Sequence, residues 1–84
     1  MNLQGKTVIY NCEPHEQDMN NGNPTAPAVV LHDWEPNAPE VQHKALNLRV
    51  LFDNPDINPE GYRTSVQHRM HNPTGSWALI EEQI

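Results

Sequence analysis

Four side chains of the kinds that bind zinc occur as two short pairs. Cys12 and His15 are three residues apart, and so are His68 and His71. Together they would supply four soft or borderline ligands, which is the number that a structural zinc site needs. Structural sites usually contain two or more cysteines, however, and nothing in the sequence brings the two pairs together. The alternative is a buried Cys12 at a strand end and three histidines in polar loops, so we predict no metal and keep zinc as an open hypothesis.

The same cysteine could act as a nucleophile with any of the five histidines. A reactive thiol needs a lowered pKa in an electropositive setting, whereas Glu13 and Glu16 beside Cys12 favour a raised pKa. Carboxylate pairs such as Asp53 and Asp56 lie in loop sequence and are typical of solvated surface. The chain has no glycine-rich phosphate loop and no nucleophile elbow. We therefore expect a protein that is not an enzyme and has no cofactor.

Three of the five basic residues fall on or beside two predicted strands. Arg49 and Arg63 are expected on outward strand faces, and Arg69 follows the second of these strands. If the strands are neighbours, the guanidinium groups converge beside Ser65 and His68. Such a patch suits a phosphate, because the arginine fork binds two oxygens at once. The alternative is that these arginines pair with nearby carboxylates.

Two tryptophans could add a stacking surface for a nucleobase. A small barrel has few other large residues to fill it, so the sequence favours Trp77 as a core residue. Trp34 stands at a strand end beside a proline-rich loop, and both a core position and a ligand-binding position stay open for it.

The elements that must position these residues are short strands, because proline and glycine leave no room for a helix of useful length. Apolar residues fall into five runs, and the third has strict alternation of the kind seen in half-buried strands. The runs cover 7–12, 28–34, 46–52, 62–66 and 76–80. We predict an all-β fold, a small five-stranded, partly open antiparallel barrel, with an SH3-like barrel as first choice and an OB-like barrel as second.

The fourth run matters most for the site, because it contains one of the arginines. Simple alternation predicts that Tyr62, Thr64 and Val66 face inward. The same pattern predicts that Arg63 and Ser65 face outward. This assignment places Arg63 on the surface.

Composition limits the partners. The chain has 84 residues, 36% of them apolar, and a formal net charge of −6. We expect residues 1–84 to form a single domain with a thin core, and a thin core barely offsets the entropy of ordering the chain. Homo-oligomerisation is therefore expected. The negative charge argues against duplex DNA, which is bound mainly by basic groups that neutralise phosphates.

Several sequence features bear on location. The single Cys12 excludes an intramolecular disulfide, and no apolar run approaches the roughly 18 residues of a membrane span. The first residues contain no secretory signal pattern. We expect a soluble protein of a reducing compartment, without a membrane partner.

Several short segments along the chain form a recognisable order: Ala28-Val-Val-Leu, Leu46-Asn-Leu-Arg-Val-Leu-Phe-Asp53, Thr64-Ser-Val-Gln-His68, Trp77 and Glu81. Together they resemble a widespread group of small bacteriophage and prophage proteins. That group reads, loosely, A-A-I-V, then V-N-L-x-V-F-x-D, then T-S-V, and closes with W-x-W-P-E. The chain departs from the pattern at Leu79 and Ile80, where the group often has a second tryptophan and a proline. The resemblance implies a phage-encoded small β protein, and it transfers no catalytic residue.

Two functions follow as expectations. The first is a non-enzymatic phage accessory protein in the host cytoplasm, a homo-oligomeric binding module that sequesters a small anionic ligand such as a nucleotide signal of host immunity. Its expected ligand-binding residues are Arg49, Arg63, Ser65, His68, Arg69 and Trp34. The alternative is a virion component that decorates a capsid or associates with a tail. A third idea, mimicry of nucleic acid by negative charge, is disfavoured because only 19% of the residues are charged.

Overall fold

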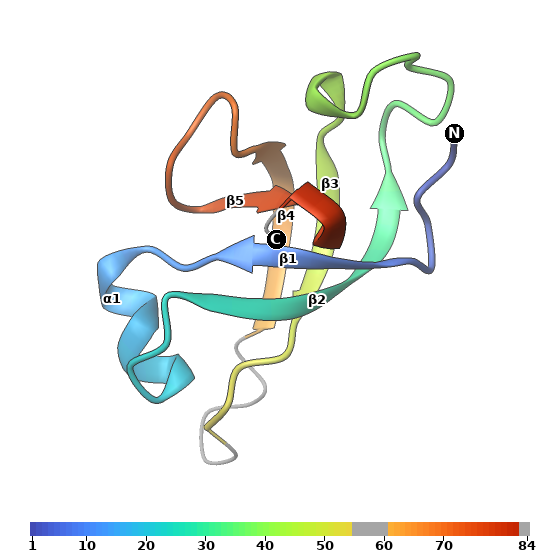
Figure 1. Cartoon of the computed structure of the whole chain (residues 1–84). Coiled ribbons are helices and arrows are strands. Elements are labelled where there is room, and N and C mark those ends of the chain that lie inside the picture. The colour runs from blue at the N-terminus through green and yellow to red at the C-terminus, as the bar shows by residue number, and fades with distance from the viewer. Residues whose placement is uncertain (55–60, 83–84) are drawn as a thin grey trace.

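The computed structural model describes residues 1–54 and 61–82, and β-strands dominate them (Figure 1). The strands are β1 (Thr7–Asn11), β2 (Thr25–Asp33), β3 (Leu46–Val50), β4 (Tyr62–His68) and β5 (Ser76–Ala78). The helices described are short, namely α1 (Pro14–Gln17) and single 3-10 turns at Asp18–Asn20, Val41–His43 and Ile80–Glu82. Each strand overlaps one of the predicted runs, which confirms the all-β, five-stranded prediction.

The strands close into a barrel in chain order, β1-β2-β3-β4-β5. Four of the pairings are antiparallel, and the barrel is completed by a parallel pairing of β4 with β5. The predicted barrel was partly open and antiparallel throughout, so the closure and the parallel pair are differences from that prediction. The closing pair is short, since within the described chain only Gln67 and His68 of β4 pair with β5. The sequential order agrees better with the SH3-like choice than with the OB-like one, whose chain path is a Greek key.

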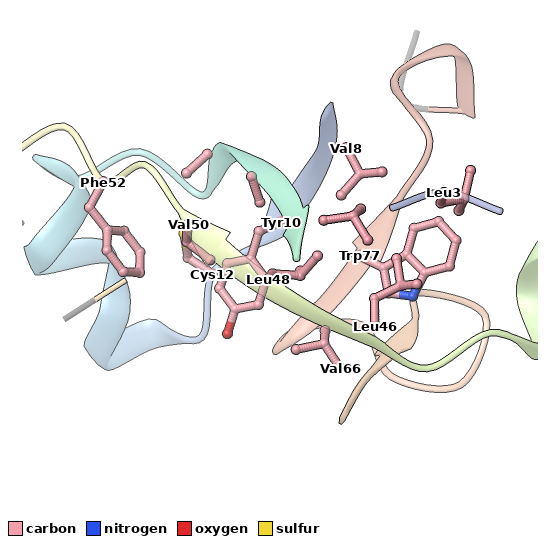
Figure 2. Packing of buried hydrophobic residues seen from close by; sticks show 13 residues of the cluster. Leu3, Val8, Tyr10, Cys12, Leu46, Leu48, Val50, Phe52, Val66 and Trp77 are labelled. Atoms are coloured by element: carbon pink, nitrogen blue, oxygen red, sulfur yellow. The ribbon is translucent and has the colours of Figure 1, made fainter. Parts of the chain in front are cut away.

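Inward side chains from all five strands fill the barrel (Figure 2). Trp77 is fully buried, which confirms the prediction that it is a core residue. Its indole Nε1 donates to the Lys44 carbonyl at 3.3 Å. Toward the other end of the cluster, Phe52 meets Tyr10 edge to face, with ring centroids 6.5 Å apart. Trp77 is therefore among the largest side chains of a thin core.

Both neighbours of β3 bulge opposite the same residue, Asn47. On β2, Leu31 and His32 together occupy the place opposite Asn47, and both are exposed. On β4, Thr64 and Ser65 do the same, and Ser65 has a left-handed backbone with φ of 51°. A bulge inserts one extra residue and so reverses the inward and outward alternation beyond it.

This reversal corrects the predicted facing of β4. Val66 points inward as expected, but Tyr62 and Thr64 are exposed. Arg63 pairs across the sheet with the buried Leu48, so it lies on the inward side and not on the outer surface. Simple alternation failed here because it assumes a strand without a bulge.

A fully buried ion pair joins the end of β2 to the segment that leads into β3. Lys44 Nζ donates to Asp33 Oδ2 at 2.9 Å, and both side chains are 0% exposed. Asp33 also accepts hydrogen bonds from the backbone N–H groups of Leu3 and Glu35. These donors outweigh the desolvation that would raise the pKa of Asp33, so its pKa is lowered and it is charged at neutral pH. The pair joins the N-terminal segment, the end of β2 and the segment before β3.

Candidate binding surfaces

The outward side chains of β2, β3 and β4 form one continuous surface, which we call the outer face. Its first row is defined by direct cross-strand pairing, since Arg49 on β3 stands between Val29 on β2 and Tyr62 on β4. The second row is formed by Asn47 and the bulge residues on either side of it. The outer face comprises Val29, Leu31, His32, Asn47, Arg49, Tyr62, Thr64 and Ser65, with Trp34 just after β2 and Leu51 just after β3.

Asn47 holds the bulged second row together. Its Oδ1 accepts hydrogen bonds from Trp34 Nε1 and from the Ser65 backbone N–H, each at 2.9 Å. His32 meets the Trp34 ring edge to face, with centroids 4.3 Å apart. The indole is therefore oriented by two contacts although it is 53% exposed. An exposed aromatic ring held in place is ready to stack on a ligand without ordering itself first.

The outer face is also unusual in its charge and apolarity. None of the residues that define it is acidic, although the chain has 11 Asp and Glu and a net charge of −6. Its formal charge comes from Arg49, which is exposed. Among the seven large hydrophobic side chains exposed in the described ranges, four lie here: Leu31, Trp34, Leu51 and Tyr62. Exposed aromatic and aliphatic groups gathered around an arginine are typical of binding surfaces.

A cavity of about 430 Å³ lies on another part of the barrel, between α1, β4 and the segment that leads into β5. We call it the α1 pocket. Its wall contains an ion pair in which Arg63 Nε donates to Glu16 Oε2 at 2.8 Å. Glu16 is 2% exposed, and the Arg63 side chain is 24% exposed. The pocket is lined by Tyr10, Glu13, His15, Glu16, Arg63, Thr64, Ser65, Val66, Gln67, Asn72 and Gly75.

Buried donors converge on the Glu16 carboxylate. Tyr10 OH donates to Oε1 at 2.8 Å, and the Glu13 backbone N–H donates to the same oxygen at 2.9 Å. Burial alone would raise the pKa of Glu16, but these bonds and Arg63 outweigh it, so the pKa is lowered. Burial, helped by the Glu16 carboxylate, raises the pKa of Tyr10. At neutral pH the network therefore contains a charged Glu16, a charged Arg63 and a neutral Tyr10.

Cys12, which the sequence disfavours as a nucleophile, lies beside this network. Burial, followed by the charge of Glu16, raises the pKa of the Cys12 thiol to about 11. Its sulfur accepts a long contact from Asn20 Nδ2 at 3.9 Å. A thiol with this pKa is almost entirely protonated at neutral pH and is a poor nucleophile.

The six predicted site residues divide among three places. Arg49, Trp34 and Ser65 belong to the outer face, and Ser65 also lines the α1 pocket. Arg63 lies in the α1 pocket on the opposite side of the sheet from Arg49, because its cross-strand partner is the inward Leu48. The alternative that an arginine pairs with a carboxylate is realised at Arg63, through Glu16.

The remaining two residues, His68 and Arg69, lie near the C-terminal turn. His68 is buried with its ring edge against Trp77, at a centroid distance of 4.9 Å. Its Nδ1 accepts the Met70 N–H, so Nε2 bears the proton and donates to Glu82 Oε1 at 2.9 Å. The charge of Arg69 also acts on Glu82. His68 is thus a buried core residue and does not belong to the outer face.

The residues of the zinc hypothesis also separate. Cys12 contacts Asn20, His68 contacts Glu82, and the His71 ring Nε2 lies 2.8 Å from the Gln42 carbonyl oxygen. In the described part of the chain, the group whose ligand atoms come together is Glu13, His15 and Glu16, all within 4.8 Å of one another. The sequence signal for this group is only a Glu-Pro-His-Glu run, which is too short to single out.

No family model, curated protein or solved structure matches this chain. None of the helices in residues 1–54 and 61–82 is long and apolar enough to cross a membrane.

Proposed function

We propose that the protein is a phage-encoded, non-enzymatic binding module that assembles as a homo-oligomer and holds a small anionic ligand, such as a nucleotide, on the outer face. One observation supports this most directly. In a chain of net charge −6, Arg49 stands on a surface without a carboxylate among its residues, beside the exposed Tyr62. The phage origin rests on the motif resemblance alone.

The chemistry of the outer face suits a nucleotide better than that of the α1 pocket. Trp34 presents an oriented indole to a base, and stacking on an aromatic ring contributes about 1–3 kcal/mol per base. Arg49 is two residues along β3 from Asn47, which binds the indole, so the Cα atoms of the two residues are about 7 Å apart. A base on Trp34 and a phosphate on Arg49 are thus compatible. The α1 pocket contains the carboxylates of Glu13 and Glu16, which repel an anion.

A second copy of the chain would complete this site. A single outer face offers one wall, and ligand sites normally enclose most of the ligand surface. Leu31 and Leu51 are exposed on the same surface and would be buried by a partner copy. Two outer faces can approach without opposing carboxylates, because their own residues include none. The ligand would then lie at the boundary between subunits.

The test is a thermal-shift and calorimetric screen against mono- and cyclic nucleotides. A ligand that binds the folded state raises the Tm in proportion to the logarithm of its concentration. Arg49→Ala and Trp34→Ala should each weaken binding about tenfold or more, because each removes a charge-assisted or stacking contact. Lys6→Ala and Met70→Ala are the matched controls, since each removes an exposed residue of similar type from elsewhere on the surface.

The proposal fails if no nucleotide changes the Tm, or if the control variants weaken binding as much as Arg49→Ala and Trp34→Ala. Detection of the protein in purified virions, together with no nucleotide binding, would support the alternative of a capsid-decorating or tail-associated component.

A further inference from the structure

The α1 pocket contains a set of metal-ligand atoms that the outer face does not involve. Glu13, His15 and Glu16 each contribute one atom, and these three atoms lie within 4.8 Å of one another. All three residues also line the cavity of about 430 Å³. Ligand atoms this close can surround one ion after small side-chain movements, because zinc needs 2.0–2.2 Å to nitrogen and carboxylate oxygen.

Glu16 is already oriented as a ligand would be. Three donors hold its carboxylate, namely Tyr10 OH, the Glu13 backbone N–H and Arg63 Nε. Metal-binding carboxylates are commonly held by outer hydrogen bonds of this kind, which fix their direction and increase affinity.

The other two side chains are free to adjust. The side chains of His15 and Glu13 are 73% and 45% exposed, and His15 Nε2 lies 3.8 Å from Glu13 Oε2. Gly75 makes room for Glu13, because a Cβ at position 75 would stand 3.1 Å from Glu13 Oε1. The backbone of Gly75 is also left-handed, with φ of 62°, so a glycine suits both the space and the conformation.

The charge of the pocket favours a cation. Glu13 and Glu16 contribute two negative charges and Arg63 one positive charge, so the formal charge of these three lining residues is negative. One imidazole nitrogen with two carboxylates suits a borderline transition metal such as Zn²⁺, whereas Ca²⁺ and Mg²⁺ favour oxygen ligands alone.

We propose that Glu13, His15 and Glu16 bind one divalent transition-metal ion of the zinc class at the wall of the α1 pocket. Three protein ligands leave further coordination positions open toward the cavity, where water or an oxygen-bearing ligand can complete the shell. This site differs from the zinc set considered on sequence grounds, with which it shares only His15.

The experiment titrates ZnCl₂ into untagged protein that has been stripped with a chelator, and follows binding by calorimetry. A parallel titration with Co²⁺ follows the visible absorption of the bound ion. We expect one site per chain. His15→Asn and Glu13→Gln should each weaken Zn²⁺ binding at least tenfold without loss of the fold, because the His15 side chain is 73% exposed and the Glu13 side chain 45% exposed.

The matched controls are His43→Asn and Glu40→Gln. They change the same residue types, three positions apart, in another exposed segment of the surface. They should leave the affinity for Zn²⁺ unchanged. The proposal is overturned if stripped protein shows no saturable Zn²⁺ binding, if His15→Asn binds like the natural sequence, or if the control variants weaken binding equally. None of these outcomes bears on nucleotide binding at the outer face, so the two proposals fail separately.

Discussion

Arg63 and Arg49 show how one residue type serves two purposes in this barrel. Arg63 holds the buried Glu16 carboxylate and lies over the Phe52 ring, with its guanidinium carbon 5.4 Å from the ring centroid. Arg49 is exposed on the outer face beside Tyr62. The first arginine stabilises the fold, and the second is the one available to a ligand.

This difference predicts that substitution by alanine lowers stability strongly at Arg63 and hardly at all at Arg49. Arg63→Ala leaves the buried Glu16 charge without its cation and should lower the free energy of unfolding by about 3 kcal/mol, at the lower end for a broken buried pair because Arg63 is partly exposed. Arg49→Ala should change it by no more than about 0.5 kcal/mol, as is usual for a surface residue. Urea denaturation of both variants measures the two values. Equal losses would contradict the separate roles.

The paired bulges form the element on which the outer face depends. They turn Leu31 and His32 outward on β2, and Thr64 and Ser65 outward on β4. Asn47 fixes the arrangement from the strand between them by accepting the Ser65 N–H and the Trp34 indole N–H. The sequence alone does not reveal this role, because an asparagine on the polar side of a strand is an ordinary occurrence.

Replacement of Asn47 tests the importance of these bulges. Asn47→Ala removes the acceptor for two donors and should lower the free energy of unfolding by about 1–2 kcal/mol, since each hydrogen bond contributes about 1 kcal/mol. It should also make the Trp34 side chain more mobile, which would lower the tryptophan fluorescence anisotropy. Asn72→Ala, which removes a more exposed amide, is the control. An unchanged stability in Asn47→Ala would show that the bulges hold without this side chain.

At the scale of the whole molecule, three carboxylates in separate places stabilise the fold through ion pairs and hydrogen bonds. Glu16 bonds to Arg63, Asp33 to Lys44 and Glu82 to His68. For all three, hydrogen bonds and opposite charges outweigh the desolvation that would raise the pKa, so the folded-state pKa is lowered. A lowered pKa means that the unfolded chain takes up protons first as the pH falls.

The fold should therefore lose stability in acid. The stabilisation from these groups is complete above the ordinary values of 4.5 for Glu and 3.8 for Asp, and it is lost progressively as the pH drops below them. Chemical denaturation followed by circular dichroism between pH 7 and pH 2.5 measures this. Glu16→Gln should be less stable at pH 7 and less sensitive to acid. A free energy of unfolding that stays constant down to pH 2.5 would contradict the role given to these pairs.

Assembly is also a property of the whole molecule. If copies associate through the outer face, light scattering coupled to gel filtration should show an oligomer that dissociates on Leu51→Glu or Tyr62→Glu. Both side chains are about half exposed in the single chain, so the variants should still fold. Met70→Glu places the same charge at an exposed site elsewhere and should leave the oligomer intact. A natural chain that is monomeric at high concentration would exclude this assembly.

How far the sequence predicts this molecule varies with the kind of residue. Five short apolar runs identified the five strands of the described residues, and the scarcity of large residues identified Trp77 as core. The prediction that Arg63 faces outward was wrong, because the pattern of apolar and polar residues does not show where a bulge lies. The burial of Lys44 was unexpected, because a lysine is seldom buried without a paired carboxylate. Its partner, Asp33, is 11 residues away in the sequence, so the pairing becomes evident only in the folded chain. The Tyr10, Glu16 and Arg63 network joins a strand, a helix and a second strand, and only the closed barrel brings them together.

The most direct test of binding at the outer face is a nitrogen-edited NMR titration of the protein with a nucleotide selected by the thermal-shift screen. The two indole N–H signals serve as internal reporters, because Trp34 is 53% exposed on the outer face and Trp77 is 0% exposed in the core. We predict that the Trp34 indole signal and the backbone signal of Arg49 shift progressively to saturation, while the Trp77 indole signal stays in place. Shifts confined to the α1 pocket, or no shift of the Trp34 indole at saturating nucleotide, would contradict the proposed binding surface.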